Sequence, residues 1–306
     1  RLVADGRATL SVLCDPIPEN ALRIREEFFP QGRVTADVEE GLVTSGIDGV
    51  IVATPTHLHF DQVLAVLRHK LPVLCEKPLA ETREKIVSLV GEAEKSGAAE
   101  LMVGYQRRFW SSYRTIKREI DSGRWGKIQA ISLHNTEDWK QTQALPGTWR
   151  NDPQQNPGGF IGDAGSHKID MILNLTGSSP IELFARVENC GSMIPIRGSV
   201  VAKLEGGIDL SLNFFGDAHH FREDLHMILE NGDLLLRDGE LWAAREKDLR
   251  KISDAEPHSD ATRGFLDLLE GKLKNPAPAR CALGVWDFTE AILASASQGR
   301  NLRLER

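Results

Sequence analysis

The first residue of interest is a lysine at the end of a short apolar run. Pro72 to Cys75 reads as a strand, and Glu76, Lys77 and Pro78 follow it directly. Because open α/β sheets bind ligands at the carboxyl ends of their strands, Lys77 would stand where a substrate or cofactor is held. Taken alone, a lysine in this context is more often a surface residue in a turn.

A carboxylate and an imidazole four residues apart form the second candidate. Asp163 and His167 lie in the glycine-rich segment 158–170, and a helix would place both on one face. A carboxylate beside an imidazole orients the ring and raises its basicity, as proton transfer near neutral pH requires. The alternative is a helix N-terminus capped by Asp163, with His167 incidental.

The third candidate is a loop with two histidines. Ala53, Thr54 and Pro55 follow the most apolar run of the chain, and His57 and His59 come next. An H-x-H pair is weak evidence for a metal without a third ligand, so we predict no metal site. A loop that borders a cofactor is the better interpretation.

The composition excludes several classes of protein. The 306 residues are 41% hydrophobic and 26% charged, as in an ordinary globular chain of about two domains. A net charge of −7 offers no basic field for nucleic acid or an anionic membrane, and no apolar run is long enough to span a bilayer. The four cysteines lack C-x-x-C spacing, so we expect a reducing compartment, the cytoplasm, with neither disulfides nor zinc.

These candidate residues must be positioned by two kinds of architecture. In the first third of the chain, strands alternate with helices, which indicates βαβ units and a doubly wound parallel sheet. The expected strands are 8–14, 48–54, 72–75 and 100–104, and the helices between them are 20–29, 59–69 and one that begins after Thr82.

After Tyr105 the pattern changes to strands with few helices between them. Asn231-Gly232 and Asp238-Gly239 are hairpin signals, so the sheet should be large and mainly antiparallel. The expected strands are 127–134, 181–188, 198–204, 207–214, 225–230, 233–237 and 240–244, with helices at 111–122, 163–175, 260–272 and 281–298. The fold class is therefore α/β, with a second, α+β domain.

The candidate segments, in this order, resemble the glucose-fructose oxidoreductase / inositol dehydrogenase / rhizopine-catabolism (Gfo/Idh/MocA) family. The resemblance covers nearly the whole chain. Five segments carry it: Val12 to Pro16; Ala53-Thr54-Pro55 with its His57-Leu58-His59 tail; Glu76-Lys77-Pro78; Gly104 to Phe109; and Trp149-Arg150 with Gly158-Gly159 and Asp163-x-x-x-His167-x-x-Asp170.

The resemblance implies an NAD(P)-dependent oxidoreductase acting on a sugar, polyol or sugar derivative. It makes His167 the general acid/base, Asp163 its partner or a substrate ligand, and Lys77 a donor to the reacting oxygen, with Lys77 and His167 bordering one cleft. Oxidising a carbinol needs a base for the O–H proton while the hydride moves to the nicotinamide, and a lysine beside the oxygen stabilises developing negative charge.

The resemblance also implies the binding residues. Those for the cofactor are Asp15, Ala53, Thr54, Pro55, His57, His59, Glu76, Lys77 and Pro78. Those for the substrate are Lys77, Arg107, Trp149, Arg150, Asp163 and His167. A carboxylate at Asp15 would bind both ribose hydroxyls and repel a 2′-phosphate, so we expect NAD rather than NADP. The alternative for Asp15 is an Asp-Pro turn that ends the strand.

Two domains follow from this comparison. Residues 1–108 would form a Rossmann-type dinucleotide-binding domain, and residues 109–306 a domain for substrate and oligomerisation.

The family begins with a strand and a G-x-G-x-x-G turn, which residues 1–15 do not contain. We expect that strand and turn in the complete enzyme, and the upstream coding sequence tests this. The alternative is a shortened member without turnover.

Two other functions remain open at this stage. An NAD-dependent glycosidase of the same family would release a leaving group from an aryl glycoside without net NADH. A non-catalytic sensor would keep the fold without the chemistry. Lys77, Asp163 and His167 argue against the sensor, whereas the missing glycine-rich turn argues for it. The sequence leaves the particular sugar and the direction of reaction undetermined.

Assembly is the last expectation. Ile208, Leu210, Leu212 and Phe214 lie on one face of strand 207–214, and the helices should cover that broad apolar face only in part. We therefore expect a homodimer or homotetramer that forms through the C-terminal sheet.

Overall fold

The computed structural model describes residues 2–44, 46–96, 100–253 and 255–304, which form two units. The first unit comprises Arg1–Gln106 and Ser259–Leu283, and the second comprises Arg107–His258 and Gly284–Arg306. Residues 259–283 thus return to the first unit, whereas the sequence predicts a single domain over 109–306. A local helical pattern carries no information about which sheet the helix joins. The functional division at residues 108 and 109 stays a prediction.

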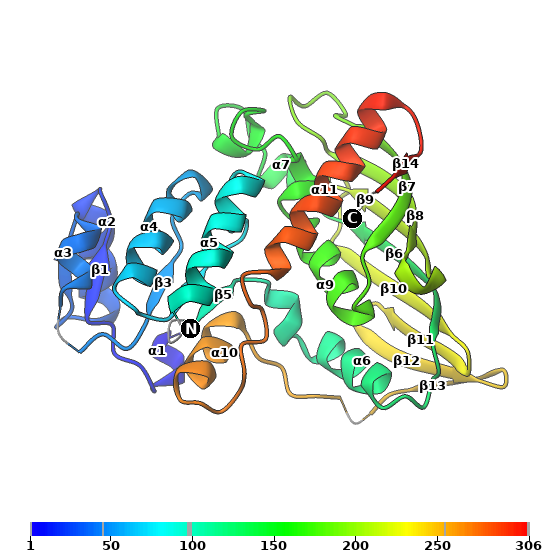
Figure 1. The fold of residues 1–306 in the computed structure, drawn as a ribbon, viewed down its shortest axis with the longest axis horizontal. Helices are drawn as coiled ribbons and strands as arrows, with labels where there is room; N and C mark the ends of the chain where they lie inside the picture. The colour runs from blue at the N-terminus through cyan, green and yellow to red at the C-terminus, as the bar shows by residue number, and fades with distance from the viewer. Residues whose placement is uncertain (1, 45, 97–99, 254, 305–306) are drawn as a thin grey trace. The chain divides into compact units, whose positions relative to one another are not determined.

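The first unit consists of short parallel strands with helices between them (Figure 1). Its strands are β1 (Val12–Cys14), β2 (Arg33–Thr35), β3 (Val50–Val52), β4 (Val73–Cys75) and β5 (Leu101–Val103). Its helices are α1 (Leu2–Asp5), α2 (Pro18–Phe28), α3 (Val38–Leu42), α4 (Thr56–Arg68), α5 (Arg83–Ser96) and α10 (Ala261–Leu269). The predicted βαβ organisation is confirmed.

The parallel strands of this unit fall into two sheets rather than one. Strands β1 and β2 pair with each other, and β3, β4 and β5 form a second sheet in that order. In dinucleotide-binding sheets the strand order is 3-2-1-4-5-6. The two sheets correspond to the strands on either side of position 1, which none of the described residues fills. Ile51 of β3 is 39% exposed, which is unusual for a strand of such a sheet.

The returning segment completes the edge of β5. The backbone N–H of Val103 donates to the carbonyl of Ala277 (2.8 Å), and the N–H of Ala279 donates to that of Leu101 (3.2 Å). Met102 and Pro278 form an antiparallel bridge between the two segments. Residues 259–283 therefore add backbone pairing to the sheet that carries β4 and its terminal loop.

The second unit is built on a mixed sheet of nine strands within the described ranges. The strands are β6 (Ile128–Thr136), β7 (Pro180–Glu188), β8 (Arg197–Leu204), β9 (Asp209–Phe215), β10 (Arg222–Leu229), β11 (Gly232–Arg237), β12 (Glu240–Arg245), β13 (Asp248–Lys251) and β14 (Leu302–Arg303). Their order is β13-β12-β11-β10-β6-β9-β8-β7-β14. All neighbours are antiparallel except β6 and β9, so the mainly antiparallel sheet is confirmed.

Helices cover one face of this sheet. The helical elements of the unit are η1 (Gln106–Phe109), α6 (Ser111–Asp121), α7 (Trp139–Thr142), η2 (Trp149–Asn151), α8 (Gly159–Gly162), α9 (Ser166–Thr176), η3 (Glu205–Gly207) and α11 (Cys281–Gln298). Helices α9 and α11 lie over one face of the sheet (Figure 1). The side chain of Ser295 on α11 accepts a hydrogen bond from the backbone N–H of Ala185 on β7 (3.0 Å).

The expectation that Ile208, Leu210, Leu212 and Phe214 form a partly bare face is wrong. Their exposed fractions are 6%, 3%, 0% and 0%, because the helices of the same chain cover this face. The opposite face is the open one. It carries Phe184 (44% exposed), Val201 (58%) and Ile228 (41%) among polar side chains. The sequence alternation identified the two faces correctly but not which of them the helices cover.

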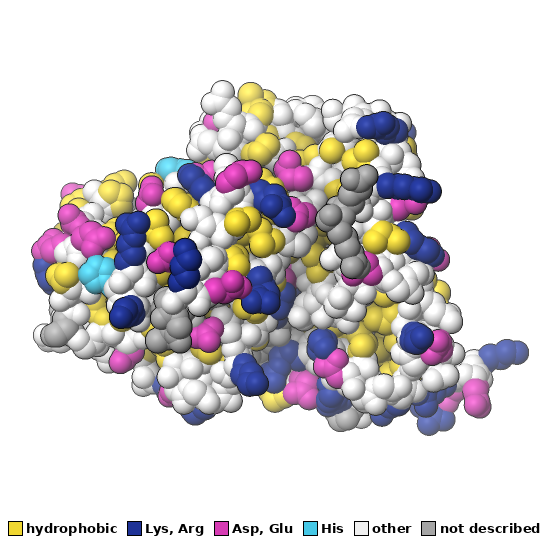
Figure 2. All heavy atoms as spheres, viewed as in Figure 1, with side chains coloured by type: hydrophobic (Ala, Val, Ile, Leu, Met, Phe, Trp, Pro, Cys, Tyr) yellow, Lys and Arg dark blue, Asp and Glu magenta, His cyan; other side chains and the backbone are white. Residues whose placement is uncertain are grey.

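The surface is mixed in charge. Figure 2 shows lysine and arginine side chains interspersed with aspartate and glutamate over the viewed face. No extended field of one sign lies on this face, which agrees with the 37 basic and 44 acidic residues of the chain. None of the helices in the described part of the chain is long and apolar enough to cross a membrane.

Candidate functional site

Two of the predicted loops lie at the carboxyl ends of adjacent parallel strands. Residues 53–55 follow β3, and Glu76-Lys77-Pro78 follow β4, which pairs with β3 in parallel. The backbone N–H of Glu76 donates to the carbonyl of Val52 (2.9 Å), so the start of the lysine loop is held at the end of β3. The Lys77–Pro78 peptide bond is cis. This edge of a parallel sheet is where ligands bind in such folds.

The two loops are also joined by a histidine. His59, on the first turns of α4, is 1% exposed. Its Nδ1 lies 2.8 Å from the carbonyl oxygen of Pro78, and its Nε2 lies 2.8 Å from that of Thr54. Both nitrogens thus face backbone, so the ring offers no nitrogen to a cofactor. Ala53 and Pro55 of this loop and His57 on the first turn of α4 are exposed and remain open to a cofactor.

The carboxyl end of β5 closes against the lysine loop. The N–H of Gly104 donates to the carbonyl of Cys75 (2.7 Å). A Cβ at Gly104 would lie 3.3 Å from the backbone Cα of Glu76, so a larger residue there would require a shift of a few tenths of an ångström between the two strand ends. Cys75 itself is fully buried, and burial raises the pKa of its thiol well above the usual 9.0. It is therefore a packing residue and not a nucleophile.

Asp15 ends β1, and its carboxylate bonds locally. Its Oδ1 accepts from the backbone N–H of Ile17 (2.8 Å), and the side-chain amide of Asn20 lies at 3.3 Å. Such a side-chain bond two residues ahead is typical of an Asp turn. Asp15 is half-buried, and its carboxylate keeps acceptor positions that these bonds do not use. The turn alternative is therefore present in the structure, while ribose binding stays a prediction.

The glycines of segment 158–165 allow close backbone packing, and the segment separates Asp163 from His167. Gly159 has φ +51° and a Cβ there would lie 2.1 Å from the carbonyl of Pro195, while one at Gly165 would lie 2.4 Å from that of Ile161. Helix α8 ends at Gly162, and α9 begins only at Ser166. The expectation that Asp163 and His167 share one helix is wrong, because the backbone at Asp163 leaves the helical conformation (φ −87°, ψ −82°) and a turn at 163–165 separates the two helices.

Asp163 is the C-cap of α8 and not the N-cap of the helix that carries His167. The N-cap of α9 is Gly165, and no side chain bonds to that cap. Instead, Oδ2 of Asp163 accepts from Nε of Arg150 (3.0 Å), whose guanidinium stacks over the ring of Trp149 at 4.3 Å. Asp163 is 6% exposed. Three residues predicted for the substrate, namely Trp149, Arg150 and Asp163, therefore lie together.

His167 occupies the first turn of α9 and is 7% exposed. Two buried charged residues follow it on the same helix. Lys168, 1% exposed, donates from Nζ to Glu137 (2.7 Å) and lies 3.7 Å from Glu223. Asp170, fully buried, accepts from Arg108 at 2.6 and 2.8 Å. These two ion pairs fix the rotation of α9 and hence the direction of His167.

The buried network shifts several pKa values. Burial lowers the pKa of Lys168, although Glu223 and Glu137 oppose the shift. For Glu223, burial acts to raise the pKa, but Lys168 and Arg107 outweigh it, so the pKa lies below the usual 4.5. Burial raises the pKa of Asp170, against the influence of Arg108. Opposite charges held in contact allow these groups to remain buried.

Arg107 belongs to this network rather than to an open surface. It is 4% exposed, and its guanidinium donates to both carboxylate oxygens of Glu223 at 2.9 to 3.2 Å. It also stacks over the ring of Trp110 at 3.7 Å. Arg107 therefore holds η1 to β10. Whether it also contacts the substrate, as the family resemblance implies, stays a prediction.

Sequence reasoning missed Lys168, Glu137 and Glu223 as supports of the site. The available signal was the charged residues at 168 and 170 within the otherwise apolar run that follows His167. Charged residues in a buried helix require partners, but their partners lie on β10 and after β6, far along the chain. For metals, the described residues contain no group of three or more His, Cys, Asp or Glu placed to bind an ion.

These features define the class of fold. A Rossmann-like parallel sheet in the first unit is followed by a second unit that is built on a large mixed sheet. Residues 2–105 match the model of the oxidoreductase family with an NAD-binding Rossmann fold, and residues 113–234 match the GFO/IDH/MocA C-terminal domain. The chain belongs to the Gfo/Idh/MocA family of oxidoreductases, as the sequence motifs predict.

Individual relatives agree with this assignment. The chain is 28% identical to the rhizopine catabolism protein MocA of Rhizobium meliloti, over 56% of this chain and 50% of that protein. It is 36% identical to inositol 2-dehydrogenase 1 of Mycolicibacterium vanbaalenii, over 39% and 34%. The alignments thus span half or less of these relatives. The WlbA dehydrogenase from Bordetella pertussis, solved with NADH and UDP-GlcNAcA, shares the fold with a TM-score of 0.82, 22% identity and coverage of 99% and 94%.

Proposed function

We propose that the protein is an NAD-dependent oxidoreductase that transfers a hydride between the nicotinamide and a sugar, polyol or sugar derivative. One observation carries the proposal: both parts of the chain match domains of a single oxidoreductase family, and each part holds its share of the reactive residues. Lys77 lies in the first unit, and Asp163 and His167 lie in the second. Its relatives include inositol 2-dehydrogenases.

The residues fit the cofactor and the chemistry. Asp15 would hold the adenosine ribose, and the exposed loop 53–55 with Glu76-Lys77-Pro78 would border the nicotinamide, which accepts or donates the hydride. His167 would take the hydroxyl proton, and Lys77 would donate to the reacting oxygen. Asp163, held by Arg150, would orient the imidazole or bind a substrate hydroxyl.

An activity panel tests this function directly. Purified full-length protein is incubated with NAD and a set of inositols, aldoses and sugar acids, and with NADH and the corresponding ketones. We expect net change of NADH absorbance with at least one of them. Release of nitrophenol from an aryl glycoside without net NADH would instead identify a glycosidase. Sugar binding without either reaction would identify a sensor.

Cofactor preference gives a second prediction. Asp15→Asn keeps an acceptor for the Ile17 N–H, so the turn should survive, but it removes the charge that repels a 2′-phosphate. We expect wild-type protein to favour NAD over NADP roughly 10- to 100-fold in kcat/KM, and Asp15→Asn to lose most of that preference at unchanged melting temperature. The exposed Asp61→Asn serves as control. Equal use of both cofactors by the wild type would contradict the ribose role.

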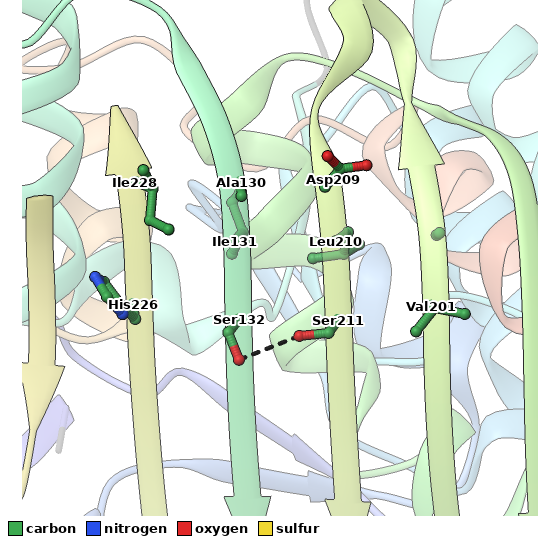
Figure 3. Close-up of a pocket in the computed structure, with 10 residues that line it drawn as sticks. Ala130, Ile131, Ser132, Val201, Asp209, Leu210, Ser211, His226 and Ile228 are labelled. Carbon is green, nitrogen blue, oxygen red and sulfur yellow. Dashed lines mark hydrogen bonds between the residues drawn. The ribbon is translucent and has the colours of Figure 1, made fainter. Parts of the chain in front are cut away.

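The compartment and the assembly complete the proposal. Cys14, Cys75 and Cys190 are thiols, which supports action in the reducing cytoplasm. A homodimer or homotetramer would form through the open face of the nine-stranded sheet. A pocket of about 330 Å³ lies on this face, across β10, β6, β9 and β8. Figure 3 shows Ile228, Val201 and the Ser132–Ser211 hydrogen bond in its lining.

The open face supplies a prediction about mass. Phe184, Val201 and Ser211 are cross-strand neighbours on the open face. Val201 is more exposed than the other two large apolar residues of this face, Phe184 and Ile228. A charge there would be buried without a partner in any dimer that uses this face. We expect an oligomeric mass at micromolar concentration for the wild type and a monomeric mass for Val201→Asp. Val87→Asp, on the exposed side of α5, should leave the mass unchanged. A monomeric wild type would refute the assembly.

A further inference from the structure

Glu137 is the member of the buried ionic network that reaches solvent. Its side chain is 20% exposed, whereas those of Lys168 and Glu223 are 1% and 4% exposed. Oε1 of Glu137 accepts from Nζ of Lys168 (2.7 Å), and the side-chain amide of Asn135 donates to the same oxygen at 3.4 Å. Oε2 accepts from no group in the described part of the chain, and it is not one of the buried oxygens without a partner. One oxygen of this carboxylate is therefore fixed, and the other is open.

The backbone of Glu137 is held as firmly as its side chain. Its N–H donates to the carbonyl of Phe215 at the end of β9 (2.9 Å), and its carbonyl accepts from the N–H of Ala218 (3.1 Å). A group that is already ordered loses little conformational freedom when it binds a ligand. The carboxylate is thus prepared for binding by bonds that a ligand does not have to replace.

The same lysine places Glu137 beside the predicted reaction site. Nζ of Lys168 also donates to the backbone carbonyl of Ala164 (3.3 Å). Ala164 lies in the turn between Asp163 and His167. The carboxylate of Glu137 and this turn are therefore neighbours around one ammonium group, and all of these residues belong to the second unit.

Two buried oxygens near Glu137 also need hydrogen-bond donors. Asn135 is fully buried, and its amide nitrogen donates to the carbonyl of Arg222 (3.2 Å), which fixes the orientation of the amide. Oδ1 of Asn135 and Oδ1 of Asp138 then have no partner among the residues that the structure describes. Buried polar atoms are nearly always paired, so such atoms call for an explanation. These two oxygens and Oε2 of Glu137 are all acceptors, so the end of β6 requires donors, supplied directly or through bridging water.

We propose that Glu137 is a specificity-determining residue whose Oε2 accepts a hydrogen bond from a substrate hydroxyl other than the one that is oxidised. The inference rests on the proposed function and narrows its substrate to a neutral polyol or sugar. An ionised carboxylate has acceptors only, so it binds a hydroxyl and not the carboxylate of a sugar acid. Lys168 does not touch the substrate in this arrangement, and it positions Glu137.

The test removes the hydroxyl from the substrate as well as the charge from the protein. Full-length protein is assayed with its best neutral substrate and with each monodeoxy analogue of that substrate. For at least one analogue we expect wild-type kcat/KM to fall roughly 10- to 100-fold, as is typical of a hydrogen bond to a charged group. In Glu137→Gln this deoxy penalty should shrink to less than about fivefold, because Lys168 retains the amide oxygen and a neutral N–H group takes the open position.

A matched control separates binding from structural support. Glu223→Gln weakens the same network on its buried side, where no oxygen is open to a ligand, so the deoxy penalty should stay at its wild-type size. If the penalty were as large in Glu137→Gln as in the wild type, Glu137 would be a structural residue only and the inference would be overturned. Should Glu137→Gln fail to fold, Glu137→Asp takes its place, since it keeps the charge for Lys168 on a shorter side chain.

A binding measurement distinguishes this inference from the proposed function. Calorimetric titration of the full-length protein with myo-inositol, D-glucose and their monodeoxy analogues, in the presence of NADH, requires no turnover. If no sugar or polyol is oxidised, the proposed function fails. Weaker binding of one deoxy analogue by the wild type, but not by Glu137→Gln, would still support the role of Glu137. Equal affinities for parent and deoxy compounds, no binding of either, or a sugar acid as the best ligand would overturn it.

Discussion

Replacing His167 with alanine should lower turnover by about 10² to 10⁴ and leave the affinity for NAD nearly unchanged. General-base catalysis is typically of this size, because the base acts on the transition state and not on the bound cofactor. His167 suits the role because Lys168 and Asp170, which follow it on α9, are held in buried ion pairs. The measurement is steady-state kinetics with the best substrate, together with NAD titration by fluorescence quenching.

Three variants sharpen this result. Lys77→Ala should lower turnover and also raise KM for the substrate, because its charge serves the ground state and the transition state alike. Asp163→Asn should be milder than His167→Ala if Asp163 only orients the ring, and comparable if it relays the proton. The exposed His219→Ala is the matched control and should retain full turnover. If His167→Ala kept more than half of wild-type turnover, the acid/base assignment would be wrong.

Removing one partner of the buried ionic network should destabilise the second unit strongly. Lys168→Met leaves Glu137 without its cation and leaves Glu223 paired with Arg107 alone. Breaking a buried ion pair typically costs about 3–5 kcal/mol, and the remaining Arg107 bonds place the expected loss at the lower end of that range. The double variant Lys168→Met with Glu223→Gln should cost less than the sum of the single changes, since it removes charges of both signs. Urea unfolding followed by tryptophan fluorescence measures these differences.

An exposed ion pair in the same sheet provides the control. Lys203 donates to Asp209 at 2.6 Å, but the two side chains are 43% and 71% exposed. Such pairs contribute about 0–1 kcal/mol, so Lys203→Met should be nearly neutral. Should Lys168→Met cost no more than Lys203→Met, the network would not fix α9 as described.

The buried ionic network also predicts that the protein loses stability at acid pH. Because the pKa of Glu223 is lowered in the fold, its contribution is complete above the ordinary value of 4.5 and is lost as the pH falls through its lower folded value. The free energy of unfolding of Glu223→Gln should therefore be lower than that of the wild type at neutral pH. The difference between the two should narrow as the pH falls below 4.5. If the difference in unfolding free energy stayed constant from neutral pH to below 4.5, the lowered pKa of Glu223 would not contribute to stability as described.

Local chemistry made much of the fold predictable. Asn231-Gly232 and Asp238-Gly239 predicted the hairpins that join β10, β11 and β12, and the structure gives Asp238 and Gly239 φ values of +51° and +77°. Turns of this kind depend on two or three adjacent residues, so their signal is local. The alternation in strand 207–214 likewise identified the buried side chains of β9.

The misses arose where distant parts of the chain decide the outcome. Whether Ile208 and Leu210 face helices or solvent depends on where α9 and α11 pack, which their own sequences do not encode. Asp163 and His167 looked like one helical pair, because the close approach of Gly165 to Ile161 is a property of the folded turn. In the same way, the partners of Lys168 become visible only when β10 and the end of β6 are brought together.

The return of Ser259–Leu283 to the first unit sets the order in which the protein can be completed during synthesis. The edge of β5 emerges from the ribosome early, but its pairing with Ala277 must wait until residues 107–258 have been made. At roughly 5–20 residues per second, this delay is on the order of ten seconds. The first unit therefore waits for residues up to Leu283, and the second unit waits for the segment Gly284–Arg306 that follows. A ribosome that stalls before residue 259 therefore releases two unfinished units with an open strand edge, the kind of product that chaperones and proteases must clear.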